Sequence, residues 1–559
     1  MEHNLWKLFS AVAHAVEPRD AIVWRQRRLS YGALFDRTCR LANVLQAQGC
    51  GPYQERGDLQ PWESGQSTVG LYMLNGPEYL EATLAGFAAR TAPFNVNYRY
   101  VADELAYLLN DADTAALVFH ARFAPNVAAV LPRLARTPFL LQVADDSGQP
   151  LLEGAVDYEE ALAQASAAPP DLEHKVDDLY LLYTGGTTGM PKGTMWRQAD
   201  IWVAALCADG DPLGDVEARS ATAAASELQR ILPNAPLMHG AAHWLALRAL
   251  LSGGTVVLNA VVDRLDPVDV WSTIADEQVS ATLFVGDAFA RPLIDELERG
   301  SYDTKSLALI AVGGAITSPA TKQRLHALLP HTIIADLAGS SETGSALSQI
   351  SMAGSTPEGG VFSPNQDVAV LNADLTRRLE PGEAEIGWFA KQTRIPLGYL
   401  GDPAKTAQTF PTVDGVRWSV PGDRARLRHD GLVELLGRDS VTINSAGEKI
   451  FAEEVEQAIL GHDDVADVIV VGRPSERWGE EVVAVVQLTP GGTATDEEVV
   501  QAAAQHLAGY KLPKAIVRVP WVLRSPAGKA DYAWARQLAS TEQSKTPHDE
   551  DAVVHSHDR

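Results

Sequence analysis

Short runs of apolar residues recur along the chain, and each run ends in a glycine-rich or polar stretch. The runs that predict strands lie at residues 180–183, 255–258, 281–285, 307–312 and 332–334. Helical patterns separate them, and this alternation is typical of α/β architecture with largely parallel sheets. Because such sheets bind ligands at loops beyond the carboxyl ends of their strands, we expect the functional chemistry in those loops.

The pattern changes after residue 437. Residues 452–460 predict a helix with Val455 and Ile459 on one face, and the apolar run 465–471 predicts a strand. Gly461 is expected to end the helix in the left-handed conformation. We therefore predict a large domain at residues 1–437 and a small α+β domain at 438–539. The polar and charged residues 540–559 predict a disordered tail.

Composition narrows the function classes. The 559 residues are 46% hydrophobic and carry a formal net charge of −26, which argues against a general nucleic-acid-binding surface. The N-terminal residues lack the pattern of a signal peptide, and no long apolar run predicts a membrane span. Cys39, Cys50 and Cys207 lack the spacing of a metal or redox site. We expect a cytoplasmic protein with reduced thiols, and leave a homodimer open.

The most specific feature is the string YTGGTTGMPKG at residues 183–193, directly after an apolar run. Its glycines let the backbone turn N–H groups inward and its threonines add hydroxyl donors, which suits a polyphosphate. It is not a Walker loop, because no Gly-Lys-Ser/Thr follows at the required spacing. A flexible surface loop is the alternative, but such loops rarely combine these residues after a buried strand.

This string resembles the phosphate loop of the adenylate-forming superfamily of acyl-CoA synthetases, luciferases and peptide-synthetase adenylation domains. The usual form has serine where Gly185 stands. Further matches follow in the family's order and cover nearly the whole chain: LSYGAL at 29–34, PLMHG at 236–240, GGA at 313–315, GSSET at 339–343, GD at 422–423, GR at 437–438 and GK at 528–529. Residues 94–100 and 525–532 look most like bacterial fatty-acyl and steroid-side-chain CoA ligases.

The resemblance implies a large N-terminal adenylate-forming domain of packed sheets and helices, and a small mobile C-terminal domain. It also implies that ATP activates a carboxylic acid as its acyl-AMP, and that the acyl group then passes to coenzyme A. Attack of a carboxylate on the α-phosphorus brings two anions together, so phosphate charge must be neutralised. Mg²⁺ would do this with Glu342 and the Thr188 hydroxyl as protein contacts. The alternative for Glu342 is a solvated acid at a helix start.

The nucleotide-binding residues follow from the same resemblance. Asp423 would accept hydrogen bonds from the ribose hydroxyls, although aspartate is also common in turns. Lys192 would contact phosphate, unless it is a surface lysine. The residues that would cradle phosphate are Thr184, Gly185, Gly186, Thr187 and Gly189. Gly314 lies in the adenine segment and Ser341 in the magnesium segment.

Residues of the second domain would serve the two half-reactions in turn. Lys529 would bridge the substrate carboxylate and the α-phosphate during adenylation, and Arg438 would contact ribose or phosphate from the hinge. Rotation of the small domain would then bring Gly447 and Lys449 to the CoA, where glycine suits close passage of a ligand chain. In the first domain, His239 would lie where the acyl pocket meets the α-phosphate, in a binding and gating role.

Two positions depart from the family pattern. Ala338 stands where an aromatic ring usually stacks on adenine, so this position supplies no stacking ring. Ser440 stands where the hinge usually has aspartate or lysine, so neither charge is present there to steady a domain orientation.

The acyl-pocket segment 238–244 is rich in small residues and contains no Lys or Arg to pair with a second carboxylate. A roomy, uncharged pocket favours a large apolar acyl group, so we expect a fatty acid or a steroid-side-chain acid. The alternative is that the small residues only allow a helix to pack closely on a sheet.

Rival functions remain open from the residues alone. An acyl-AMP ligase that loads a carrier-protein thiol and a luciferase-like oxidase would share the adenylation residues. A degenerate, non-catalytic nucleotide-binding protein is disfavoured by Glu342, Asp423, Arg438 and Lys529.

Overall fold

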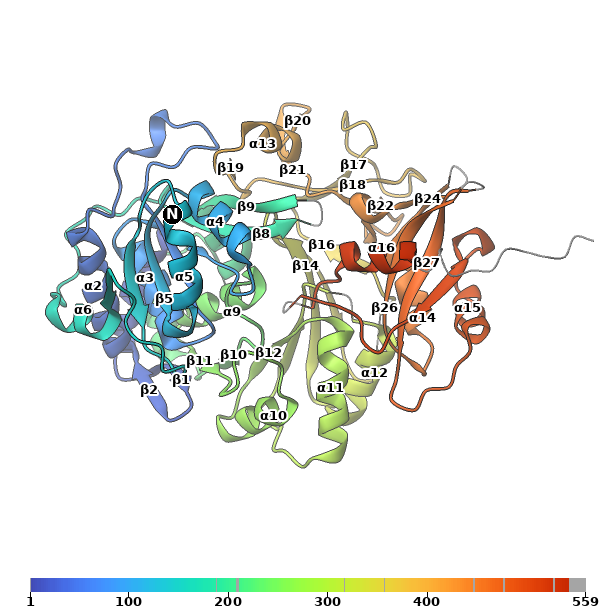
Figure 1. Ribbon diagram of the computed structural model, residues 1–559, viewed down its shortest axis with the longest axis horizontal. Helices are drawn as coiled ribbons and strands as arrows, with labels where there is room; N and C mark the ends of the chain where they lie inside the picture. The colour runs from blue at the N-terminus through green and yellow to red at the C-terminus, as the bar shows by residue number, and fades with distance from the viewer. Residues whose placement is uncertain are drawn as a thin grey trace, which may run out of the picture. The chain divides into compact units, whose positions relative to one another are not determined.

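The computed structural model describes residues 2–186, 189–207, 211–315, 317–355, 357–445, 448–475, 478–525 and 528–541. The chain divides into two compact units. The first runs to Leu435, and nearly all of the chain from Leu436 onward forms the second (Figure 1). Each unit has its own hydrophobic cores, so each is described by itself.

One sheet of the first unit is a parallel, five-stranded sheet of order β4-β3-β5-β6-β7. Its central strand β5 and its helix α3 are buried at every position, so this layer forms a main core. The elements are α1 (Leu5–Ala15), α2 (Tyr31–Ala47), β3 (Thr68–Tyr72), α3 (Pro77–Ala88), β4 (Ala92–Asn95), α4 (Ala102–Asp111), β5 (Thr114–His120), α5 (Ala124–Val130), β6 (Phe139–Val143), β7 (Ala155–Asp157) and α6 (Tyr158–Gln164).

The long sheet of the first unit begins as a parallel α/β sheet. Strands β1, β11, β10, β12, β13 and β14 pair in parallel, and β2 pairs with β1 in antiparallel fashion. Helices α10, α11 and α12 pack on it around Trp271, Phe284 and Leu293. The bounds are β1 (Asp20–Trp24), β2 (Arg27–Ser30), β10 (Arg230–Leu232), β11 (Thr255–Leu258), α10 (Pro267–Asp276), β12 (Ala281–Phe284), α11 (Gly286–Arg299), β13 (Leu309–Val312), α12 (Pro319–Leu328) and β14 (Ile333–Ser340).

Beyond β14 the sheet continues in antiparallel pairs, which the largely parallel pattern did not predict. These strands are short and mix polar with apolar residues, so their period is weak in the sequence. They are β15 (Gly344–Ser351), β16 (Val361–Pro364), β17 (Val368–Leu371), β18 (Gly387–Gln392), β20 (Thr412–Val413), β21 (Val416–Ser419), β22 (Asp423–Leu427) and β23 (Val433–Arg438).

A three-stranded sheet of order β19-β9-β8 completes the first unit's sheets. It consists of β8 (Leu179–Gly186), β9 (Gly189–Arg197) and β19 (Gly398–Tyr399). Helix α9 (Gly240–Leu251) and the short π-helix Trp202–Leu206 pack against each other. Among the described residues, no helix is long and apolar enough to cross a membrane.

The second unit is a mixed sheet with an apolar core on each face. Along β26 and β27, Val468, Val470 and Val482 lie in the core with α14 and α15, whereas Ile469 and Val483 lie in the core with α16. This alternation is the period of two that a strand imposes. The elements are β24 (Ile443–Ser445), β25 (Glu448–Ile450), α14 (Ala452–Leu460), β26 (Val465–Ser475), β27 (Gly479–Leu488), α15 (Asp496–Ala504), β28 (Ala515–Arg518) and α16 (Tyr532–Thr541).

The predicted helix at 452–460 is α14, and Val455 and Ile459 are both fully buried. The prediction for Gly461 is wrong, because its φ of −67° and ψ of −13° are right-handed. His462 N–H donates to Ile459 O at 3.1 Å, so the chain leaves the helix in a further right-handed turn. Ser540 and Thr541 of the predicted tail lie in α16, and residues 542–559 lie outside the described residues.

Candidate active site

The predicted phosphate loop is the tip of a β-hairpin in the first unit. Strands β8 and β9 pair in antiparallel fashion, with Thr184 opposite Lys192 and Gly186 opposite Gly189. Thr187 and Thr188 lie outside the described residues. Of Gly185, Gly186 and Gly189 only the backbone is described. Gly193 is required by a close approach, because a Cβ there would meet the Tyr183 ring at 2.8 Å.

Asn95 links this hairpin to the predicted acyl-pocket segment, a role that the sequence analysis missed. Its Nδ2 donates to the carbonyl oxygens of Tyr183 and Met238, both at 2.7 Å, and its Oδ1 accepts from Tyr183 N at 2.8 Å. The side chain is buried. The signal in the sequence that could have predicted this role is a polar residue at the end of the apolar strand β4.

Glu342 lies in a tight turn that joins β14 to β15, not at a helix start. Thr343 N donates to Ser340 O at 3.1 Å, and Ser340 N donates to the Thr343 hydroxyl at 2.9 Å. Glu342 N donates to the Ser340 hydroxyl at 3.2 Å. Glycine is required at residue 339 of this hairpin, because a Cβ there would lie 1.9 Å from Gly344 O. The turn therefore fixes the main-chain position from which the Glu342 side chain extends.

Side chains from three other strands hold the main chain of this turn. Trp196 Nε1 of β9 donates to Ser341 O at 2.8 Å, and the Ser419 hydroxyl of β21 donates to Glu342 O at 2.7 Å. Lys391 Nζ of β18 donates to Thr343 O at 2.8 Å and is only 2% exposed. Burial lowers the pKa of Lys391, although nearby Asp367 opposes this. The turn is thus anchored from several sides.

The Glu342 carboxylate has its own partner in Tyr399 of β19, whose hydroxyl donates to Glu342 Oε1 at 2.8 Å. Lys192 Nζ lies 5.7 Å from the centre of the Tyr399 ring and pairs with Asp402 Oδ2 at 2.9 Å. Asp402 is partly buried, which works against its charge, but hydrogen bonds from Lys405 N and Lys192 lower its pKa overall. The structure therefore brings Lys192 and Glu342 to the same ring.

His239 and His243 have different environments at the start of α9. His239 is half-buried and precedes the helix as its N-terminal cap residue. His243 is buried, with Nδ1 3.1 Å from the Tyr180 hydroxyl and Nε2 3.2 Å from the Thr83 hydroxyl. Burial lowers the pKa of His243 to about 3, so it is neutral at physiological pH. We therefore regard His243 as a core residue within the segment 238–244.

The predicted adenine segment follows β13. Gly314 has a φ of +80°, the left-handed region that favours glycine, and a Cβ at Gly313 would lie 3.2 Å from Leu337 O. The loop therefore passes close to β14. Ala338 is half-buried opposite Leu347 of β15, against an apolar cluster.

Asp423 is the first residue of β22 and follows Gly422, whose φ is +103°. The strand β22 pairs with β18, which also carries Lys391. Ser419, four residues before Asp423, bonds to Glu342 O as described above. The predicted ribose and magnesium carboxylates therefore belong to one connected part of the sheet.

In the second unit, the predicted hinge residues contact the start of α14. Arg438 N–H donates to Glu453 Oε1 at 3.3 Å. Gly437 has a φ of +118°, and a Cβ there would lie 2.2 Å from Glu453 Oε2. Glycine is therefore required before Arg438. Gly447 lies outside the described residues, and Lys449 is described only by its backbone in β25, opposite Asn444.

Lys529 lies on a short loop whose ends pair through a bridge between Arg524 and Ala530. Ser525 N donates to Lys529 O at 2.8 Å, and Lys529 N donates to the Ser525 hydroxyl at 3.2 Å. The Lys529 residue is exposed. Exposure of the residue suits the predicted role, which requires contact with a ligand.

The residues fit a Mg²⁺ that arrives with ATP. Within the described ranges, no group of three or more His, Cys, Asp and Glu side chains is suited to a metal. Mg²⁺ usually takes one or two carboxylates and completes its shell with phosphate oxygens and water. Glu342, fixed by its turn and by Tyr399, is a carboxylate of this kind.

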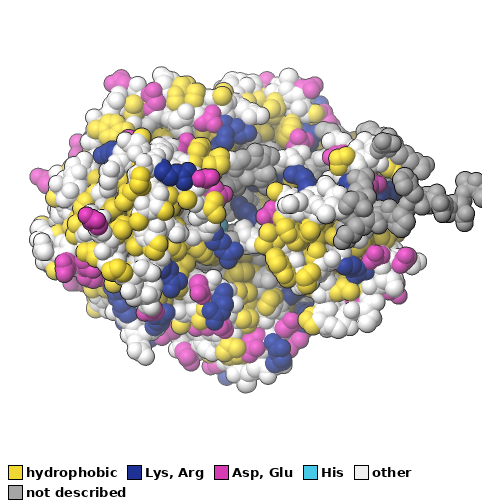
Figure 2. Space-filling view, in the orientation of Figure 1, with side chains coloured by type: hydrophobic (Ala, Val, Ile, Leu, Met, Phe, Trp, Pro, Cys, Tyr) yellow, Lys and Arg dark blue, Asp and Glu magenta, His cyan; other side chains and the backbone are white. Residues whose placement is uncertain are grey.

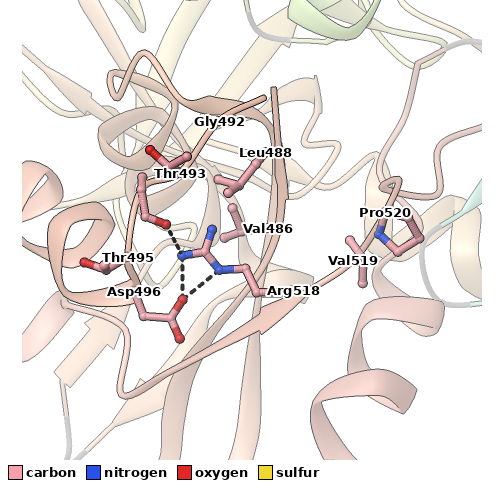
Figure 3. A pocket seen from close by; sticks show the side chains of 10 residues that line it. Val486, Leu488, Gly492, Thr493, Thr495, Asp496, Arg518, Val519 and Pro520 are labelled. Atoms are coloured by element: carbon pink, nitrogen blue, oxygen red, sulfur yellow. Dashed lines mark hydrogen bonds and ion pairs between the residues drawn. The ribbon is translucent and has the colours of Figure 1, made fainter. Parts of the chain in front are cut away.

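A hollow of about 530 Å³ in the second unit contains none of the predicted site residues (Figure 3). Its charged lining residues pair with each other, since Arg518 Nε donates to Asp496 Oδ1 at 2.7 Å. On the face drawn in Figure 2, basic side chains are scattered among acidic and apolar ones.

Comparison with known proteins gives the family. The sequence matches the AMP-binding enzyme family over residues 9–387 and the AMP-binding enzyme C-terminal domain over residues 454–529. It is 52% identical over 533 residues to the medium-chain acyl-CoA ligase Mig of Mycobacterium avium, covering 95% of this chain and 97% of that protein. It is 40% identical to a 3-oxocholest-4-en-26-oate–CoA ligase of Rhodococcus rhodochrous, covering 96% of each.

A solved structure agrees in fold. The anthranilate CoA ligase AuaEII, in complex with anthranoyl-AMP, superposes with a TM-score of 0.79 at 19% identity, covering 97% of this chain and 98% of that one. The chain belongs to the AMP-binding enzyme family. The predicted family, fold class and enzyme class, an AMP-forming acid–CoA ligase that uses ATP, Mg²⁺ and coenzyme A, are confirmed.

Proposed function

We propose that the acid activated by this ligase is a medium- or long-chain fatty acid or a steroid-side-chain acid. The observation that carries this proposal is full-length similarity to ligases named for a medium-chain acyl group and for a cholestenoate. The segment 238–244 supports it, because it is rich in small residues and has no Lys or Arg. Each buried CH₂ contributes about 0.8 kcal/mol, so such a pocket favours large apolar acids.

The reaction has two half-reactions. A carboxylate oxygen of the acid first attacks the α-phosphorus of ATP, and the bond from that phosphorus to the bridging oxygen of pyrophosphate breaks. The sulfur of CoA then attacks the carbonyl carbon of the acyl-AMP, the acyl–oxygen bond breaks, AMP leaves and the thiol proton is released. Both steps move negative charge through the site, so fixed positive charge and N–H donors would accelerate them.

In the first unit we assign nucleotide binding to the hairpin and the Glu342 turn. The backbone of the loop glycines and the hydroxyls of Thr184 and Thr187 would hold the β- and γ-phosphates, and Lys192 would neutralise phosphate charge beside them. Glu342, oriented by Tyr399, and the Thr188 hydroxyl would hold Mg²⁺, which supplies positive charge to the phosphate oxygens when bound. Gly314 would border the adenine, Ser341 would bind nucleotide in the segment that carries Glu342, and Asp423 would accept from the ribose hydroxyls.

In the second unit we assign one face to each half-reaction. Lys529 would stabilise charge between the carboxylate and the α-phosphate in adenylation only. Arg438 would contact ribose or phosphate at a functional boundary between residues 437 and 438, and Gly447 and Lys449 would approach CoA after rotation. His239 would gate the junction between acyl pocket and α-phosphate.

The test is the rate of ATP-dependent thioester formation over a panel of acids with CoA: acetate, octanoate, palmitate, a cholestenoic-type acid and an amino acid. We expect kcat/KM to be highest for one of the large apolar acids. A preference for acetate or for the amino acid would contradict the proposed substrate class. A parallel assay with a carrier-protein thiol in place of CoA tests the rival acceptor.

We further propose a cytoplasmic location, because Cys39, Cys50 and Cys207 are all free thiols. A homodimer stays a prediction, and the molecular mass in solution would decide it.

A further inference from the structure

The loop that carries Lys529 is tied to the second unit through a buried ion pair. Arg524, which begins the loop, donates from Nε to Asp467 Oδ2 at 2.7 Å and from Nη2 to Asp467 Oδ1 at 2.6 Å. Its Nη2 also donates to Val468 O at 3.2 Å. The two side chains are only 17% and 12% exposed. Two parallel N–H···O bonds fix the angle of a guanidinium as well as its distance.

Asp467 is itself held in place within β26. Its Oδ1 accepts from Val468 N at 2.8 Å, and β26 pairs with β27 along most of its length. Burial works against the charge of Arg524, but the bonds to Asp467 raise its pKa overall, so the guanidinium stays charged. The anchor of the loop is therefore a rigid strand in the interior of the unit.

The ion pair is connected to Lys529 by a short series of contacts. Arg524 pairs with Ala530 across the base of the loop. Ser525, the next residue, exchanges two hydrogen bonds with the main chain of Lys529, at 2.8 and 3.2 Å. Any change in how Arg524 sits on β26 is thereby passed to the Lys529 backbone.

Stability of the fold does not require an ion pair between Asp467 and Arg524. Replacing a buried ion pair by apolar residues of similar volume is often neutral or stabilising, so such a pair is weak evidence for a role in folding. What the pair adds here is a fixed orientation of Arg524, the first residue of the loop, on β26.

We propose that Asp467 and Arg524 are positioning residues that orient Lys529 for adenylation. This inference rests on the proposed role of Lys529. A shift of about 1 Å in a reacting group can cost roughly 100-fold in rate. Because the thioester-forming step does not use Lys529 in that proposal, loosening its loop should slow adenylation alone.

The experiment measures the two half-reactions separately in the full-length enzyme. Adenylation is followed as pyrophosphate release with octanoate and ATP, and acyl transfer as octanoyl-CoA formation from supplied octanoyl-AMP and CoA. We expect Arg524→Met and Asp467→Asn to lower the kcat of adenylation roughly 10- to 100-fold, with little change in the KM for ATP. Acyl transfer should keep its rate, and Arg524→Lys, which keeps the charge, should recover part of the loss.

A second ion pair in the same unit gives a matched control. Arg473 Nε donates to Glu481 Oε1 at 2.8 Å, and these side chains are 12% and 17% exposed. Arg473 also lies on β26 and bonds to a main-chain oxygen, that of Ala539. Arg473→Met removes a buried ion pair of similar exposure without touching the Lys529 loop, so it should leave both half-reactions unchanged.

Lys529→Ala is measured alongside and separates the possible failures. If it slows both half-reactions equally, the proposed role of Lys529 is wrong. If it slows adenylation alone while Arg524→Met slows both half-reactions or neither, the positioning role is overturned. The same holds if Arg473→Met reproduces the selective loss. Should Arg524→Met fail to fold, as judged by thermal unfolding, Asp467→Asn and Arg524→Lys decide by the same criterion.

Discussion

The turn that carries Glu342 and the loop that carries Lys529 position their charges in different ways. The Glu342 turn is bonded by Trp196, Lys391, Tyr399 and Ser419, which come from four different strands of the first unit. In the Lys529 loop, Ser525 bonds to the main chain of Lys529, and Arg524 bonds to the interior of the second unit. Lys529 itself is exposed.

This difference matches what the proposed chemistry asks of each charge. A carboxylate that holds Mg²⁺ on the nucleotide is needed in a constant position, and many bonds from a rigid sheet provide one. In the proposed chemistry a lysine used in only one half-reaction is presented and then withdrawn, so it needs fewer bonds to its surroundings and a defined backbone position. The following predictions test this contrast.

The largest effect is expected at Lys529. Lys529→Ala should slow acyl-AMP formation by about 10²–10³-fold, because a charge that stabilises the transition state is lost. Acyl transfer from supplied acyl-AMP should suffer much less. Pyrophosphate release and thioester formation measure the two steps, and Lys514→Ala, at another exposed lysine of the second unit, is the control. Equal loss in both steps would remove the contrast.

The next effect is expected at Glu342. Glu342→Gln keeps the shape of the side chain and removes its charge, so Mg²⁺ should bind more weakly. The Mg²⁺ concentration needed for half-maximal pyrophosphate release should rise by at least roughly 10- to 100-fold. That is the usual cost of losing a residue that only hydrogen-bonds to a metal ligand, and loss of the ligand's own charge should cost no less. The unfolding temperature serves as a check on the fold. An unchanged Mg²⁺ titration would exclude Glu342 from the metal site.

A smaller effect in the same direction is expected at Tyr399. Tyr399→Phe removes only the hydroxyl that donates to Glu342, so the carboxylate stays but loses orientation, at a cost of about 10-fold in Mg²⁺ requirement. Tyr302→Phe is a matched control, because the Tyr302 hydroxyl donates to Glu296 Oε1 at 2.7 Å on the first unit, outside the site. If both variants behave alike, the hydrogen bond at Tyr399 does not serve the metal.

The sequence predicted the elements whose periodicity is strong. The runs 255–258 and 281–285 became β11 and β12, the second one residue shorter, and the helix 452–460 has the predicted bounds. The antiparallel strands after β14 were missed because a strand such as β18 buries Lys391 among apolar residues. Its pairing is set by contacts with distant strands, which local patterns do not record.

Local motifs likewise named Glu342 and Lys529 but not the side chains that support them. Tyr399 is 57 residues from Glu342 in sequence, and Asn95 is 88 residues from Tyr183. Asp467 is also 57 residues from Arg524, although a carboxylate within the apolar run of β26 was a signal that it has a buried partner. Such contacts are created by the topology, so a single sequence without its fold cannot pair them.

The smallest effect is expected at Ala338, in the strand that leads into the Glu342 turn. If no other ring stacks on adenine, Ala338→Tyr should tighten ATP binding by up to about 0.5–1.5 kcal/mol. Calorimetric titration with ATP measures this, and Ala338→Leu adds bulk without an aromatic face. Because Ala338 lies outside the bonds that fix the turn, the Mg²⁺ requirement should not change in either variant.

The outcome at Ala338 also shows how far the rigidity of the Glu342 turn extends. Ala338 packs against the cluster of Ala346, Leu347 and Phe389, so a ring at this position must fit beside that cluster. Tighter ATP binding in the tyrosine variant alone would mean that residue 338 faces adenine. Weaker binding in both variants would mean that the space is already filled, and a raised Mg²⁺ requirement would mean that strain at residue 338 reaches the turn. In that last case the turn is less independent of its strand than its four anchoring bonds imply.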